Sequence, residues 1–375
     1  MKIALVTLHF DNVGGIERCV TALCRWFVKW GHEVHVFCAS AHGPFPGGVK
    51  VHLVRVPARP WGLKVLSFGL LAPRAVSGCP GGPFDAVHAH TVYLGPSTLA
   101  TAHSVHRAAV AADPPPRGWR RIRYLLSGVP VLAAMASDST FRQARRVAAI
   151  SRMIGRELVR SAGVPKCRIV LSYLGVDSAG FRPLAPARKA QVRLRAGMDA
   201  GSFWFCFCGW NWRRKGLDTV IDALQRIGGR SRLLVIGEDP MEGRVFREAA
   251  RGLGKRVLFA GRRGTPAPLM AACDAFAFPT RYESYGMVVA EAMACGLPVL
   301  VPRQAGVSEV VHTSRSLQVL GSPENVGVLA SRMALLMGRP ALARRLGRDN
   351  RRAAMELTWE QYSKETMKHY REAVR

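Results

Sequence analysis

Short apolar runs alternate with amphipathic stretches through the first half of the chain. Residues 3–7 form an apolar run that predicts a buried strand, a turn with Gly14 and Gly15 follows, and apolar side chains recur at helical spacing over residues 16–27. Further strands are predicted at residues 34–38, 86–89, 99–103, 146–150 and 169–173. A β-α-β opening with glycines in its first turn is typical of a doubly wound sheet.

The same alternation restarts near residue 203. Strands are predicted at residues 203–208, 233–236, 257–259, 275–278 and 299–301, with helical patterns between them. Such alternation favours a parallel sheet with helices on both faces. We therefore predict an α/β protein with two Rossmann-like doubly wound domains facing a cleft. The domains are residues 1–178 and 179–357, and a terminal helix at 358–375 is predicted to cross back to the first.

Two carboxylates follow the predicted strand at residues 275–278. A helix is predicted from Gly286 to the Gly-Leu-Pro stop at 296–298, which places Glu283 in the turn and Glu291 in the helix. Carboxylates near a core are costly unless a ligand uses them, and a helix N-terminus favours anions. The segment therefore predicts a site for a sugar attached to a phosphate. The alternative is that both carboxylates are simply solvated.

A basic turn follows the predicted strand at residues 203–208. It begins at Gly209 and carries Arg213, Arg214 and Lys215 where the strand ends. Open α/β sheets bind ligands at this end of their strands, and Arg and Lys hold phosphate oxygens. The turn predicts a diphosphate site, and a solvated basic turn remains the alternative.

Two features of the first half also point to a ligand. Gly14 and Gly15 permit a close backbone approach, although the full GxGxxG fingerprint of dinucleotide sites is missing. His103 lies at a predicted strand end, where an imidazole can donate to a sugar hydroxyl or a phosphate. A purely structural histidine is the alternative.

Charge and cysteine content narrow the partners. The net charge is +29, with 22 Lys/Arg against 8 Asp/Glu over residues 1–180 and 32 against 17 over the remainder. Such a field favours an anionic partner, although an Arg-rich genome would give the same excess. The nine cysteines form no CxxC pair, so we expect core packing in a reducing compartment and no metal site. No secretory signal or 18-residue apolar run is present, which predicts a location in the cytoplasm or on the cytoplasmic membrane face.

These features, in this order and over nearly the whole chain, resemble the GT-B nucleotide-sugar glycosyltransferases. The resemblance is to the retaining family 4 with its "glycosyl transferases group 1" C-terminal domain, whose E-x7-E motif corresponds to residues 283–291. Within that family, the turns at 214–216 and 237–240 look most like those of lipopolysaccharide-core glucosyltransferases. Leu174 and Asp239 depart from the asparagine and glycine that many members carry there.

The resemblance implies a role for each donor-side residue. Glu283 would approach the hydroxyls of the transferred sugar and Glu291 those of the ribose. The amides of Gly286, Met287 and Val288 would meet the phosphate.

The remaining carried-over roles fall on the two loops described above. Arg214 and Lys215 match the donor-phosphate cations, Gly14 and Gly15 the glycine turn near the diphosphate, and His103 the strand-end histidine near the sugar. The first domain would hold the acceptor and the second the donor.

The implied reaction moves a sugar from a nucleotide-diphosphate sugar to an acceptor hydroxyl with retention at the anomeric carbon. Cations would stabilise the leaving diphosphate, so we expect no metal and no cofactor beyond the donor substrate. Residues 59–71 and 117–126 mix aromatic, apolar and basic side chains as interfacial helices do. We therefore expect a glycolipid or lipopolysaccharide precursor as acceptor and an anionic membrane surface as partner. Ordinary amphipathic packing is the alternative for both segments.

Three other classes remain open. A nucleic-acid-binding protein would suit the charge, but the sequence contains no recognisable motif for one. A nicotinamide oxidoreductase would need an acidic ribose partner, for which Glu33 in a predicted turn is the nearest candidate. A sugar-nucleotide epimerase could share the architecture. An inactive family member is disfavoured because the two glutamates and two cations occur together.

Overall fold

A computed structural model describes residues 1–11, 13–58, 60–112 and 129–374. The chain divides into two compact units, Met1–Gly175 with Trp359–Arg375, and Val176–Thr358. The chain passes from one unit to the other after Gly175 and again before Trp359, and the backbone at the first place contacts the backbone at the second. A Cβ on Gly175 would lie 2.6 Å from the Trp359 nitrogen, so only glycine allows the two passages to run this close together.

The first unit is built on a parallel sheet. Its main strands in the described residues are β1 (Lys2–Val6), β3 (Glu33–Cys38), β5 (Val49–Leu53), β6 (Ala86–Ala89), β7 (Ser97–Ala102), β8 (Ala144–Ala149) and β9 (Ile169–Leu171). They form one sheet in the order β5-β3-β1-β6-β7-β8-β9. β2 (His9–Phe10) and β4 (Ser40–Ala41) pair separately. Because β1 is central and later strands lie on both sides of it, the carboxyl ends of β1, β6 and β7 meet at one edge.

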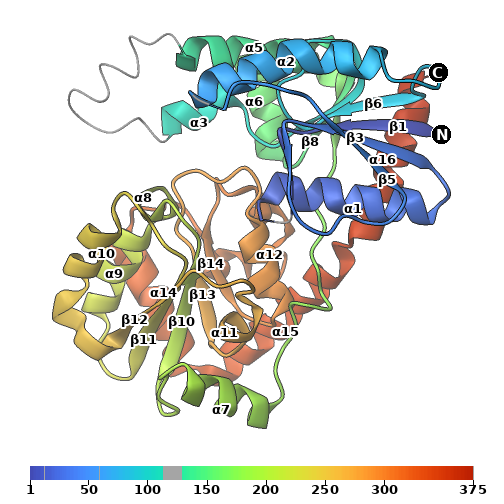
Figure 1. The fold of residues 1–375 in the computed structure, drawn as a ribbon. Coiled ribbons are helices and arrows are strands. Elements are labelled where there is room, and N and C mark those ends of the chain that lie inside the picture. Colours follow the sequence, from blue (N-terminus) through green and yellow to red (C-terminus); the bar gives the residue numbers. More distant parts are fainter. Residues whose placement is uncertain (12, 59, 113–128, 375) are drawn as a thin grey trace. The chain divides into compact units, whose positions relative to one another are not determined.

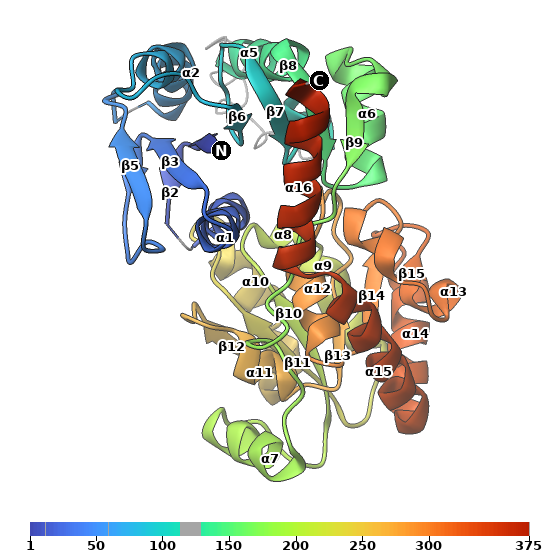
Figure 2. The same ribbon diagram turned by 90° about the vertical axis from the view of Figure 1, so that its right-hand side faces the viewer.

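Helices cover this sheet (Figure 1). They are α1 (Gly15–Lys29), α2 (Trp61–Ser77), α3 (His106–Ala112), α5 (Val129–Gln143), α6 (Arg152–Ala162), the 3₁₀ turn η1 (Lys166–Arg168) and α16 (Trp359–Val374). The terminal helix α16 contacts α1 and runs alongside β7 (Figure 2). Its Tyr362 and Tyr370 are fully buried, and the Tyr370 hydroxyl lies 2.8 Å from Nδ1 of His88 on β6. The last helix is therefore part of the first unit's core.

The second unit repeats the plan. Over residues 176–358 its strands are β10 (Phe203–Cys208), β11 (Ser231–Ile236), β12 (Val257–Gly261), β13 (Ala275–Ala277), β14 (Val299–Pro302) and β15 (Val319–Leu320). They form a parallel sheet in the order β12-β11-β10-β13-β14-β15. The order reverses between β10 and β13, so this pair forms the switch point where doubly wound sheets bind ligands.

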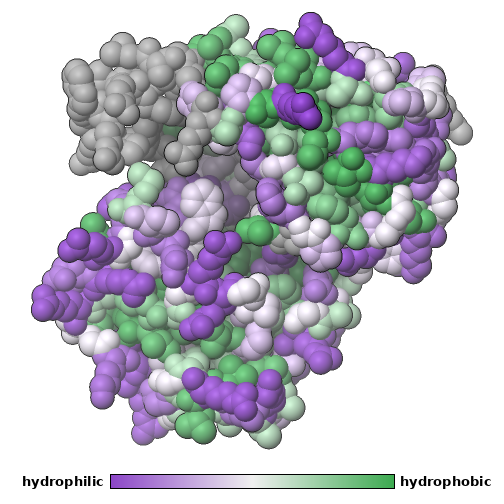
Figure 3. All heavy atoms as spheres, viewed as in Figure 1, coloured by the Kyte–Doolittle hydropathy of each residue, from purple (hydrophilic) through white to green (hydrophobic). Residues whose placement is uncertain are grey.

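Helices also cover the second sheet. They are α7 (Pro186–Arg195), α8 (Trp212–Lys215), α9 (Leu217–Arg226), α10 (Gly243–Ala249), α11 (Ala267–Ala271), α12 (Met287–Ala294), α13 (Arg315–Gln318), α14 (Val326–Gly338) and α15 (Pro340–Glu356), with 3₁₀ turns η2 (Arg251–Arg256) and η3 (Gly306–Val310). Hydrophilic side chains cover much of the α9 and α10 surface (Figure 3). Helix α12 packs closely against α15.

The structure confirms the predicted parallel α/β architecture and adds strands that the pattern did not show. The short strands β2, β4 and β15 and the edge strand β5 were not predicted. In β5 every side chain is at least partly exposed, so no buried alternation marks it. Glu33 begins β3 instead of lying in a turn. Cys206 and Cys208 are buried in β10, as their predicted packing role requires.

No single helix among the described residues is long and apolar enough to cross a membrane. One bent pair, Val326–Gly338 with Pro340–Val374, meets the criterion by length and composition alone.

Gly347→Ala tests the α12–α15 packing. A Cβ on Gly347 of α15 would lie 2.0 Å from the Gly296 oxygen at the end of α12. We expect the variant to lose about 1–3 kcal/mol of unfolding free energy in urea, because the helices must separate. Gly327→Ala in α14 is the matched control, since its Cβ would meet neighbours only at 3.6 Å and beyond. It should be neutral or gain up to about 1 kcal/mol from helix propensity. Equal stability of the two variants would contradict the packing.

Candidate functional site

The basic turn is held at the carboxyl end of β10 by unusual backbone conformations. Asn211 adopts the left-handed region at φ 53°, and its side-chain oxygen accepts from the Arg214 amide at 3.3 Å. Gly216 ends the turn at φ 78°, where a Cβ would lie 2.1 Å from the Pro279 oxygen. Only glycine permits this approach, so the turn is pressed against the loop that follows β13. Gly209, at φ 152°, opens the turn and donates to the Ile236 oxygen at 3.0 Å.

Lys215 and Glu283 form an ion pair at the centre of this contact. The Lys215 side chain is buried, Glu283 is 16% exposed, and the ammonium donates to the Glu283 carboxylate. The same ammonium lies 5.2 Å from the centre of the Phe278 ring. Arg214 donates to the Tyr282 oxygen at 3.3 Å. The structure thus brings together the two predicted features, the basic turn and the first glutamate of the pair.

The loop after Glu283 leads directly into α12. Glu283 forms a parallel bridge with Ala305, and its oxygen accepts from the Gly306 amide at 3.0 Å. Gly286 is the N-cap at φ 103° and supplies no side chain to the helix end. The first amides of a helix have no intrahelical acceptor. The positive end of α12, with Met287 and Val288 in its first turn, therefore begins three residues after Glu283.

Glu291 lies in the middle of α12 and is 3% exposed. Its charge contributes to the raised pKa of the nearby Cys295 thiol, which burial lifts to about 12. A buried carboxylate requires compensating partners. The structure places this residue on the same helix as the Gly286 cap, as the motif predicted.

Asp239 is a polar residue of this region whose role the sequence did not reveal. One of its carboxylate oxygens accepts from the Trp212 amide at 2.8 Å, and the other accepts from the Met241 amide at 3.0 Å. The carboxylate therefore ties the loop after β11 to the start of α8. Its position in the Gly-Glu-Asp-Pro turn after a predicted strand was the available signal.

The first unit holds the other predicted residues. Gly14 is the N-cap of α1 and Gly15 its first residue, and a Cβ on Gly14 would lie 2.0 Å from an oxygen of Glu17. Burial raises the pKa of the Glu17 carboxyl, and the charge of Asp11 adds to this. Glu17 is thus folded back over the glycine turn.

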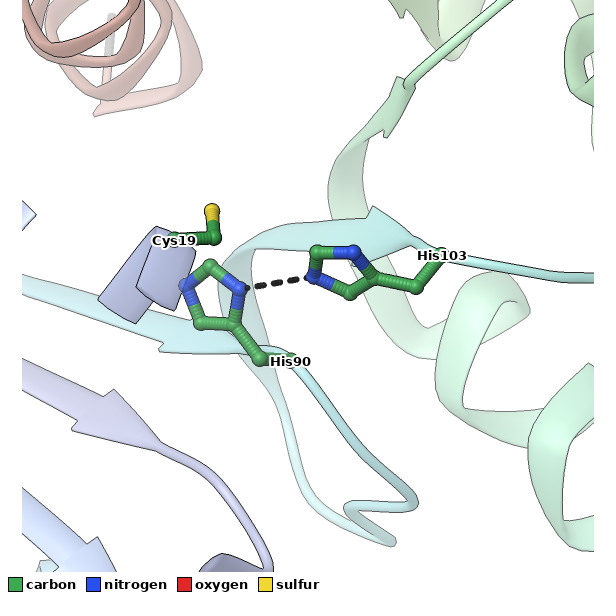
Figure 4. A group of neighbouring side chains, drawn as sticks. All are labelled: Cys19, His90 and His103. Carbon is green, nitrogen blue, oxygen red and sulfur yellow. Dashed lines mark hydrogen bonds between the residues drawn. The ribbon is translucent and has the colours of Figure 1, made fainter. Parts of the chain in front are cut away.

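Three histidines contact one another in series near the end of β7. His103 follows β7, and its Nε2 lies 3.1 Å from Nδ1 of His90 (Figure 4). The His90 ring in turn lies 4.0 Å from the ring of His88, centre to centre. Burial lowers the pKa of His103 to about 4 and holds the pKa values of His88 and His90 well below their ordinary value. All three imidazoles are neutral at pH 7. His88 lies on β6 and His90 directly follows it, so their spacing of two residues was the available signal.

A cavity of about 300 Å³ opens beside His103 within the first unit. Glu17, His90 and Trp61 contribute to its lining, together with residues of α2 and α5. Its mixture of imidazole, carboxyl and apolar groups suits a ligand that carries both hydroxyls and carbon surface.

Two family models cover most of the chain. The model described as "Glycosyltransferase Family 4" matches residues 13–179, and the one described as "Glycosyl transferases group 1" matches residues 202–339. The chain belongs to this glycosyltransferase family. Of the classes that the sequence left open, the family selects the sugar transferase, in agreement with the resemblance carried by residues 283–291.

Individual relatives agree with the family. The D-inositol 3-phosphate glycosyltransferase of Xylanimonas cellulosilytica is 28% identical, over 94% of this chain and 95% of its own. The crystal structure of WaaG, a glycosyltransferase involved in lipopolysaccharide biosynthesis, has a TM-score of 0.81 at 20% identity, over 97% and 98% of the two chains. Anabaena HepE, solved with UDP and glucose, has a TM-score of 0.74 at 20% identity, over 98% and 99%. The structural matches establish the two-domain GT-B fold of this glycosyltransferase.

Three histidines, His88 and His90 buried and His103 partly exposed, predict a pH dependence of stability. An unfolded histidine takes up a proton near pH 6.5, whereas His88, His90 and His103 resist protonation when folded. The unfolded state therefore binds more protons, and the free energy of unfolding should fall as the pH drops from 7 to 5. Each such group contributes up to about 1.4 kcal/mol per pH unit.

The His90→Gln variant should show a shallower slope of unfolding free energy against pH than wild type, measured by urea unfolding. The exposed His42→Gln control should keep the slope, and parallel curves for wild type and His90→Gln would refute the assignment.

Proposed function

We propose that this glycosyltransferase moves a sugar from a nucleotide-diphosphate sugar to an acceptor hydroxyl with retention of the anomeric configuration. The observation that carries the proposal is the ion pair of Lys215 with Glu283 beside the α12 N-terminus. A phosphate requires positive groups and a sugar requires hydrogen-bond acceptors. The loops after β10 and β13, at the switch point of the second sheet, offer positive groups and hydrogen-bond acceptors side by side.

The donor would bind through its diphosphate first. Arg214 and Lys215 supply positive charge, and the amides of Gly286, Met287 and Val288 supply the helix end that favours anions. Glu291 would accept from the ribose hydroxyls. HepE has the same fold and was solved with UDP and glucose, which supports the proposal of a nucleotide-sugar donor for the present protein.

Lys215 and Glu283 would then divide the work of the reaction. Glu283 accepts hydrogen bonds from the transferred sugar, and Lys215 stabilises the charge that builds on the diphosphate as the bond from the anomeric carbon to the phosphate oxygen breaks. The acceptor oxygen attacks from the side that the diphosphate leaves, and its proton passes to the departing phosphate oxygen. Because Lys215 and Arg214 supply the charge stabilisation, we propose that the reaction proceeds without a metal ion.

The acceptor would bind in the first unit. The cavity beside His103 is lined by Glu17, Trp61 and other polar and apolar groups, and the neutral His103 imidazole can donate to a sugar hydroxyl. Gly14 and Gly15 would let the start of α1 approach the diphosphate.

Transfer by variants tests the donor site. Lys215→Ala and Glu283→Ala should each lower kcat by about 10²–10³-fold, the cost of losing one group that contacts the transition state, while circular dichroism remains that of the folded protein. Lys255→Ala, at an exposed lysine of η2, is the matched control and should keep wild-type turnover.

Nucleotide-sugars are first screened by thermal shift, since a ligand of the folded state raises the midpoint of thermal unfolding. NMR of the product then reports its anomer. Near-normal turnover in either variant, or product formed without acceptor as an epimerase would give, would refute the proposal.

We further propose that the acceptor is a lipid-linked glycan, such as a lipopolysaccharide precursor, met at an anionic membrane surface. Helix α2 exposes Trp61, Leu63 and Leu70, and its neighbour α5 exposes an apolar group of its own, with Val131 59% and Met135 55% exposed. Buried residues occupy the opposite face of α2, so its packing does not account for the exposed side chains. Arg59 and residues 117–126, also expected at the membrane, lie outside the described residues.

Vesicle cosedimentation tests the membrane proposal. The protein should bind anionic vesicles more than neutral ones, with binding that weakens as salt rises, because each nearby cation adds about 1 kcal/mol. Leu63→Glu should reduce binding, whereas Leu194→Glu, at an exposed leucine of the second unit, should not. Equal partitioning to neutral and anionic vesicles at every salt concentration would exclude an anionic surface as partner.

A further inference from the structure

Two histidines and a cysteine converge in the first unit, away from the residues used above. His35 lies on β3, His52 on β5, and Cys79 follows the C-cap of α2. Their ligand atoms, His35 Nδ1, His52 Nε2 and Cys79 Sγ, all lie within 4.8 Å of one another. His52 and Cys79 are 17 and 44 residues from His35, which is why no spacing motif revealed them.

The distances are close to those of a tetrahedral zinc site. Zn–N bonds of about 2.05 Å and Zn–S bonds of about 2.3 Å place two ligand nitrogens about 3.3 Å apart and a nitrogen and a sulfur about 3.5 Å apart. Here His35 Nδ1 lies 2.9 Å from His52 Nε2 and 3.7 Å from Cys79 Sγ. Shifts of a few tenths of an ångström would therefore admit the ion, and the half-buried His52 ring, stacked 4.5 Å from the Phe37 ring centre to centre, would move along the face of that ring.

A carboxylate already supports the outer face of His35. Nε2 of His35 lies 3.0 Å from Oε1 of Glu33, which also accepts from Lys50 at 2.5 Å. An ionised carboxylate holds the proton on Nε2 and directs the Nδ1 lone pair of His35 toward His52 and Cys79. This is the arrangement by which carboxylates orient metal-binding histidines.

The loop that carries Cys79 is also held in place. The Lys2 ammonium donates to the Pro80 oxygen at 3.2 Å and the Gly82 oxygen at 3.0 Å, and the Lys2 amide donates to Asp85 at 2.7 Å. The sulfur is therefore positioned from β1 as well as from α2. Preorganised ligands lower the cost of assembling a metal site.

We propose that His35, His52 and Cys79 bind a borderline-soft transition-metal cation, of which Zn²⁺ is the reference case. On binding, His52 moves its proton from Nε2 to Nδ1 and Cys79 releases its thiol proton to solvent, so one proton is released per ion. The fourth position is open to water. The ion would link the edge strand β5 to β3 and to the end of α2.

This site is separate from the proposed transfer reaction. Cys79 precedes β6 whereas His103 follows β7, so the two positions lie toward opposite ends of the parallel strands. A second convergence, of Cys19 with His90 and His103, is the internal rival (Figure 4). There the Cys19 thiol already donates to the Tyr362 hydroxyl at 3.3 Å, and burial raises the pKa of Cys19 to about 12. Forming a thiolate there is costly.

Cobalt substitution followed by zinc competition tests the proposal. Tag-free full-length protein is freed of metal with a chelator and titrated with Co²⁺ in buffer without thiols. A sulfur-to-cobalt charge-transfer band in the near ultraviolet is expected at one equivalent, and Zn²⁺ should displace it. Cys79→Ser should abolish the band, whereas Cys167→Ser, at an exposed cysteine of η1, and Cys19→Ser should retain it. Glu33→Gln should keep the band but weaken metal affinity by about 10–100-fold.

Thermal denaturation supplies a second readout that does not depend on colour. Zn²⁺ should raise the midpoint of wild type and of Cys167→Ser but not that of His52→Ala. If His52→Ala is poorly folded, the more conservative Cys79→Ser carries the comparison. A wild-type protein without a cobalt band, a band that survives Cys79→Ser, or a band lost only in Cys19→Ser would each overturn the proposal.

Discussion

The contact between Lys215 and Glu283 is the interaction on which the site depends. The two residues are 68 positions apart and follow β10 and β13, strands that pair directly although two others come between them in sequence. The left-handed Gly216 brings the basic turn against Pro279, and Gly286 then turns the chain into α12. A half-buried carboxylate beside a buried ammonium is stable only while both remain in place. The pair therefore sets the separation between the cationic loop and the positive end of α12.

Several of the 54 Lys and Arg side chains have structural roles. Arg193 and Lys189 hold Asp274 at the start of β13, and Arg281 makes a two-point contact with Asp218 at 2.8 and 2.9 Å. Arg256 donates to the Leu224 oxygen at the end of α9. Such guanidinium groups donate hydrogen bonds to backbone and loop oxygens that would otherwise accept them from water. Because the net charge of +29 already subtracts every Asp and Glu, these pairs leave that excess in place.

Periodicity predicted the parallel strands because buried strands of an α/β protein are nearly continuous apolar runs. It failed for β5, whose solvent-exposed positions leave no apolar run, and for Glu33, which begins a strand after a glycine turn. The Glu283 segment and the basic turn were recognisable because each follows a strand, and doubly wound sheets gather strand ends. The convergence of His35, His52 and Cys79 was not predictable, because it depends on strand order and on a loop held by Lys2. The roles proposed for the donor-side residues, and those of Gly14, Gly15 and His103, in the transfer all remain predictions.

Calorimetric titration of the donor and its parts tests the central claim most directly. A nucleoside diphosphate and the matching nucleotide-sugar are titrated into wild type, Lys215→Met, Glu283→Gln and the double variant. We predict that Lys215→Met weakens both ligands by at least about tenfold, whereas Glu283→Gln weakens only the sugar-bearing ligand. The loss for the nucleotide-sugar in the double variant should differ from the sum of the single losses, because the two side chains touch. Unchanged affinities in Lys215→Met, or equal losses of both ligands in Glu283→Gln, would contradict the account.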